Sequence, residues 1–170
     1  MILGMSTSAF TLLHVVLSLI GIATGFVVVA GMFGSKTVDG WTAVFLATTV
    51  LTSVTGYFFP VDRVLPSHIV GAISLVALVF ALLAFYRYRL EGSWRWIYVV
   101  TALVALFLNV FVAVAQAFQK VPFLNALAPT QSAPPFIVTQ LVVLLAFVGL
   151  GIVALRSFHP GTHAAALRPL

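Results

Sequence analysis

Two histidines, His14 and His68, stand near the start of long apolar segments, where an ionisable side chain is costly to bury. Both segments are expected to run in the same direction, so the two imidazoles would lie in the same half of a membrane. Two histidines on neighbouring helices can bind a single haem b iron axially, which would make the protein a membrane cytochrome or a quinone-linked electron carrier. The alternative is structural: His14 hydrogen-bonds a neighbouring hydroxyl or carbonyl group, and His68 caps the helix that starts after Pro66 and Ser67.

A second polar group follows another apolar segment at helical spacing. Asn109, Gln116 and Lys120 are predicted to share one helix face, and Gln140 lies one turn into the next apolar segment. A buried amide without a partner costs free energy, so each amide must find a hydrogen-bond partner. These side chains either make interhelical hydrogen bonds or line a path for a proton, a quinone headgroup or a small solute.

The third group is a loop with prolines at both ends, which carries Asp62 and Arg63. This pair is interpreted as an ion pair or anion contact at the mouth of a site, or else as part of a solvated loop. The chain has three carboxylates in all and no cysteine, which leaves no carboxylate pair within the membrane and no thiolate ligand. We therefore expect no metal site and no hydrolytic chemistry, and we favour a protein without enzymatic activity.

The composition places these residues in a membrane. Of the 170 residues, 62% are hydrophobic and only 6% are charged, whereas about a quarter of the residues in a soluble domain are charged. Apolar runs long enough to cross a bilayer predict a single all-α membrane domain over residues 1–170. Its five predicted spans are 9–33, 41–59, 67–86, 96–118 and 136–155.

The second of these spans is rich in hydroxyl side chains, which can bond to carbonyls one turn back or face neighbouring helices. We expect Thr48 or Thr52 of this span to be the partner of Asn109. In the long connection before the fifth span, the apolar residues around Phe123 predict a short segment that lies along the membrane surface.

Basic residues predict the orientation of the bundle. Six of the eight lysines and arginines fall on the side that holds the connections 34–40 and 87–95 and the C-terminal tail. The other side holds Arg63 and Lys120. Because basic residues concentrate on the cytoplasmic side, we expect the N-terminus outside and the C-terminus in the cytoplasm, in the inner (plasma) membrane of the cell.

Small and polar residues recur along the predicted helices at steps of three and four. Gly21 and Gly25 form such a stripe with His14 and Ser18 in the first span, and similar stripes run along the third and fourth spans. Small residues let helix backbones approach closely, so these faces are predicted to meet at the centre of the bundle while large apolar residues face lipid.

These observations leave three hypotheses about function. The first is a packing subunit of a homo-oligomer or of a larger membrane complex, whose partners are the lipid bilayer and other membrane subunits. The second is the electron carrier that uses His14 and His68, and the third is a pathway for a small solute or a proton. No cluster of basic residues indicates a nucleic-acid partner.

Overall fold

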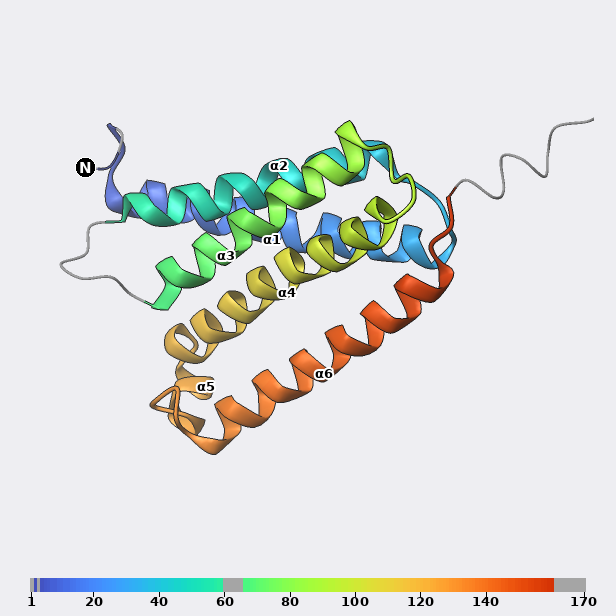
Figure 1. Cartoon of the computed structure of the whole chain (residues 1–170). Coiled ribbons are helices and arrows are strands. Elements are labelled where there is room, and N and C mark those ends of the chain that lie inside the picture. The colour runs from blue at the N-terminus through green and yellow to red at the C-terminus, as the bar shows by residue number, and fades with distance from the viewer. Residues whose placement is uncertain (1, 3, 60–65, 161–170) are drawn as a thin grey trace, which may run out of the picture.

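The protein is a bundle of helices (Figure 1). The structure, a computed structural model, describes residues 2, 4–59 and 66–160. Five helices are long and apolar enough to cross a membrane, which confirms the predicted all-α, five-span fold. They are α1 (Thr7–Phe33), α2 (Asp39–Thr55), α3 (Pro66–Leu82), α4 (Trp94–Lys120) and α6 (Pro134–Ser157).

Three short elements complete the described chain. A 3₁₀ turn, η1 (Gly56–Phe58), extends α2, and a π-helical turn, η2 (Leu83–Arg87), extends α3. The short helix α5 (Pro122–Leu127) forms where the sequence predicted an interfacial segment, and Phe123 is among its exposed side chains. Prolines occupy the first turn of both α5 and α6, where a missing backbone N–H carries no penalty.

Helix α4 is the central element of the bundle. It contacts each of the other long helices, while α1 packs mainly on α2 and α3 packs mainly on α4. Helix α6 runs beside α4 and touches α1 over a shorter stretch (Figure 1). Helices α1 to α4 therefore form a compact group, with α6 attached to one side of it.

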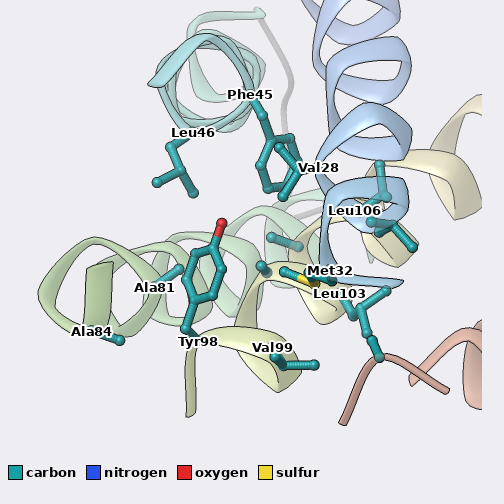
Figure 2. Packing of buried hydrophobic residues seen from close by; sticks show 14 of the residues in the cluster. Val28, Met32, Phe45, Leu46, Ala81, Ala84, Tyr98, Val99, Leu103 and Leu106 are labelled. Atoms are coloured by element: carbon teal, nitrogen blue, oxygen red, sulfur yellow. The ribbon is translucent and has the colours of Figure 1, made fainter. Parts of the chain in front are cut away.

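The interior of this group of helices has an apolar half and a half that carries polar side chains. The half that contains the end of α1 and the start of α4 is filled by an apolar cluster, of which Figure 2 shows a part. Val28, Phe45, Leu78 and Leu106 belong to it, one from each of the four helices. The other half, where α1 and α3 begin, carries the polar side chains described below.

The predicted small-residue faces lie inside the bundle over part of their length, since Gln116 and Lys120 of the fourth span are exposed. Gly21 and Gly25 of α1 are buried, as are Ser74 and Ala81 of α3. Large apolar side chains cover the outside instead, and Leu145 of α6 is 68% exposed. This inverted pattern is the one expected where lipid is the solvent.

Candidate functional site

A cavity lies between α1, α2, α3 and α4 in the half of the bundle where α1 and α3 begin. Its volume is about 90 Å³, which gives room for a few water molecules. Both predicted histidines line it, together with hydroxyl and amide side chains from the four helices. The polar residues that matter most below are His14, Ser18, Thr49, Thr52, His68 and Asn109.

His14 reaches the cavity from α1 and is held by the end of α2. Its Nδ1 lies 2.8 Å from the hydroxyl oxygen of Thr55. The ring of Phe59 packs edge-on against the imidazole, with 5.3 Å between the ring centroids. The structural alternative for His14, a hydrogen bond to a neighbouring hydroxyl, therefore describes its geometry.

His68 enters the same cavity from the first turn of α3, beside Tyr57. The two rings stack at 5.3 Å between centroids, and the Tyr57 hydroxyl donates a 2.6 Å hydrogen bond to the backbone carbonyl of His68. Gly71, one turn further along α3, leaves the space for this tyrosine, because a Cβ there would lie 3.2 Å from Tyr57 Cε2. Tyr57 was not predicted from the sequence, where nothing but its place beside the connection to α3 marked it.

Asn109 of α4 reaches the inner part of the cavity wall and is 8% exposed. Its Oδ1 accepts a 2.7 Å hydrogen bond from the Ser18 hydroxyl, and its Nδ2 donates to the Ser18 carbonyl at 3.4 Å. The expected partner in α2, Thr48 or Thr52, was therefore wrong: the Thr48 hydroxyl donates instead to the carbonyl of Val44.

Close packing at Gly21 explains why Asn109 pairs with α1. A Cβ at Gly21 would lie 3.0 Å from Thr49 Oγ1 and 3.2 Å from Asn109 Nδ2. Because Gly21 has no side chain, α1 comes close enough to α2 and α4 for the Asn109 amide to bond both the side chain and the backbone of Ser18.

Two hydroxyls in the cavity wall point to a polar occupant. Thr49 Oγ1 and Thr52 Oγ1 are buried and have no hydrogen-bond partner among the described residues. Thr49 is only 1% exposed, and a buried hydroxyl without a partner costs about 1–3 kcal/mol. Thr49 and Thr52 both line the cavity, and water or another small polar molecule that reached these oxygens would remove this cost.

The described wall of the cavity carries no permanent charge. None of the described residues that line it is an aspartate, glutamate, lysine or arginine. Further along the helices, Gly25 lies against Leu106 and Phe45, so the apolar cluster closes the cavity on the side of the membrane centre. Asp62 and Arg63, predicted at its mouth, lie outside the described residues.

The remaining predicted site residues lie elsewhere. Gln116 and Lys120 are exposed and do not line the cavity, so Gln116 does not point into the same interior as Asn109. Gln140 is buried in α6, where its Nε2 donates to the carbonyl of Phe111 at 3.0 Å and its Oε1 has no partner among the described residues. It therefore joins α6 to α4 and not to the cavity.

The described residues do not fit a haem. The cavity that His14 and His68 share is far smaller than a porphyrin. In the described part of the chain, no three His, Cys, Asp or Glu side chains gather where they would hold a metal ion.

No family model, no curated protein and no solved structure matches this chain.

Proposed function

We propose that this multi-pass membrane protein takes a proton or a small neutral polar solute into the cavity beside His14 and His68. The observation that carries this proposal is the buried, unpartnered Thr49 hydroxyl in a cavity that reaches Asn109. A hydroxyl without a partner is costly in a membrane core, and a polar occupant that reached it would supply the missing partner.

The same proposal includes the orientation of the site. With most basic residues at the opposite end of the bundle, the positive-inside rule places the cavity in the outer half of the plasma membrane. The apolar cluster around Phe45 and Leu106 separates it from the cytoplasmic half. The site would then exchange its occupant with the outside.

Cysteine accessibility tests this proposal, because the natural chain has no cysteine. Thr52→Cys places a thiol in the cavity wall, and we expect a small water-soluble thiol reagent to modify it when added to the outside of intact cells. Thiolates react and thiols in lipid do not, so labelling requires water at the site.

Leu51→Cys is the matched control, because Leu51 is the adjacent residue of α2 and its side chain is exposed on the outer surface of the bundle. We expect no labelling of Leu51→Cys. Equal labelling of both variants, or no labelling of Thr52→Cys from the outside, contradicts the proposal.

We propose a role as a packing subunit as a second candidate, supported by the exposure of α6. Only Phe136, Gln140, Phe147 and Ala154 of its 24 residues are buried. The rest of the helix offers an apolar surface that a second copy or another membrane subunit can cover. The mass of the protein in mild detergent tests this: we expect an oligomer, and a monomer at all protein concentrations contradicts it.

A further inference from the structure

The hydrogen bonds of Thr55 determine which nitrogen of His14 carries its hydrogen. The Thr55 hydroxyl oxygen lies 2.7 Å from the carbonyl oxygen of Leu51 and 3.2 Å from that of Thr52. Two oxygens at 2.7 Å need a hydrogen between them, and a carbonyl has none to offer. The single hydroxyl hydrogen of Thr55 is therefore directed to the backbone of α2.

His14 must therefore be the donor in its hydrogen bond with Thr55. At 2.8 Å from Nδ1, the Thr55 oxygen has only lone pairs left, so Nδ1 donates its hydrogen to Thr55. A neutral imidazole carries one N–H, which leaves Nε2 with a free lone pair. His14 is one of the residues that line the cavity.

We infer that Thr55 holds His14 in the Nδ1–H tautomer, so that Nε2 of His14 is the atom that accepts a proton from the cavity. This inference rests on the proposed function and names the ligand as the proton. A hydronium ion in the cavity transfers its proton to Nε2 and remains as water, while Nδ1 keeps its hydrogen and its bond to Thr55. Release reverses the same transfer.

The surroundings of His14 suit a proton that is taken up and given back. Tyr57 and His68 are the other titratable side chains among the described lining residues, and no charged side chain is among them. Phe59 covers the ring with an apolar edge. A permanent carboxylate partner would hold the proton on the ring, whereas hydroxyl groups and water allow it to leave.

Nitrogen-15 NMR of histidine-labelled protein in lipid vesicles tests the inference, with the His14 signals assigned by their loss in His14→Gln. At alkaline pH we expect Nδ1 to be protonated and Nε2 to be unprotonated. When the pH is lowered, Nε2 should gain a proton while Nδ1 stays protonated. A wild-type ring with its hydrogen on Nε2 at alkaline pH overturns the inference.

Two variants test the role of Thr55. Thr55→Ser keeps the hydroxyl and should keep the Nδ1–H tautomer, whereas Thr55→Val removes the acceptor and should give a ring with substantial Nε2–H. Retention of the Nδ1–H tautomer in Thr55→Val contradicts the positioning role. Labelling of Thr52→Cys is independent of these signals, so a hydrated cavity with the opposite tautomer refutes this inference and leaves the proposed function in place.

Discussion

At the scale of single residues, two glycines set how closely the first helix approaches its neighbours. Gly21 faces polar atoms of α2 and α4, while Gly25, one turn further, faces Leu106 and Phe45. The same stripe of small residues thus packs against polar side chains at Gly21 and against the apolar cluster at Gly25. Close packing of this kind is the main source of helix association in lipid.

Replacing Gly25 with leucine should destabilise the bundle. Even a Cβ at this position would lie 2.6 Å from Leu106 Cδ1, so a larger side chain must push α1 away from α4. Overpacking of this kind costs about 1–3 kcal/mol, and we expect a clearly lower apparent Tm in detergent. Gly149→Leu is the control, because a Cβ there meets no atom within 4 Å; equal Tm values for the two variants would show that Gly25 does not face the interior.

Asn109 gives a second prediction at this scale. Asn109→Ala removes both hydrogen bonds to Ser18, and interhelical hydrogen bonds in membranes contribute on average about 0.6 kcal/mol each. We expect a modest fall in apparent Tm. Gln116→Ala changes an exposed amide on the same helix and should leave the Tm unchanged. An Asn109→Ala protein as stable as the wild type would show that the Ser18 bonds add nothing.

At the scale of elements, α6 is the least attached of the long helices. Phe147 packs against Phe107 of α4 and Phe26 of α1, and Gln140 bonds the backbone of α4. At the other end, Arg95 of α4 donates from Nη1 to the carbonyls of Leu155 at 3.3 Å and Phe158 at 2.6 Å. A cation at a helix C-terminus also interacts favourably with the helix dipole.

Arg95→Ala should therefore loosen the C-terminal end of α6. Hydrogen bonds from a charged donor contribute about 1.5–3 kcal/mol, and their loss should speed amide hydrogen exchange in the last turns of α6. Arg156→Ala removes the same charge from an exposed position at the same end of the helix, where only the interaction with the helix dipole is lost, and should change the exchange much less. Exchange that is equally fast in both variants would assign the effect to charge and not to the two carbonyls.

At the scale of the whole molecule, the bundle combines a polar half with an apolar half. The cavity and its histidines lie where α1 and α3 begin, and the apolar cluster of Figure 2 fills the opposite half. A polar path across the whole membrane is absent from the described residues, because Gln116 and Lys120 are exposed and Gln140 packs elsewhere. The arrangement suits a site that opens to one side.

Reporter fusions test which end of the bundle faces the cytoplasm. A phosphatase fused after Leu170 should be inactive and a fluorescent protein at the same position should fold, because the C-terminus is predicted in the cytoplasm. A phosphatase fused after Pro129, in the connection between α5 and α6, should be active. The reverse result at both positions would place the cavity on the cytoplasmic side.

Much of this architecture was predictable from hydropathy. The five runs predicted the observed spans to within two residues at each end when η1 and η2 are counted with α2 and α3, because length and apolarity alone decide which segments can span a bilayer. That His14 and His68 line the same cavity was also predictable, since both stand near the same end of parallel helices. Their spacing carried no information about the size of the cavity between them.

The hydrogen-bond partners were not predictable in the same way. Which hydroxyl faces Asn109 depends on the rotation of each helix about its axis, and that rotation follows from close packing at Gly21. Thr48 bonds its own helix, as hydroxyls in helices often do, and was therefore unavailable. The role of Tyr57 depends on the 3₁₀ turn after α2, for which the sequence offers no distinct pattern.

An experimental structure in lipid, at a resolution that shows ordered water, tests the central claim most directly. We predict density for water or another small polar molecule in the cavity, within hydrogen-bond distance of Thr49 Oγ1 and Thr52 Oγ1. A closed cavity, in which protein atoms satisfy both hydroxyls and no density lies beside His14, would contradict the account.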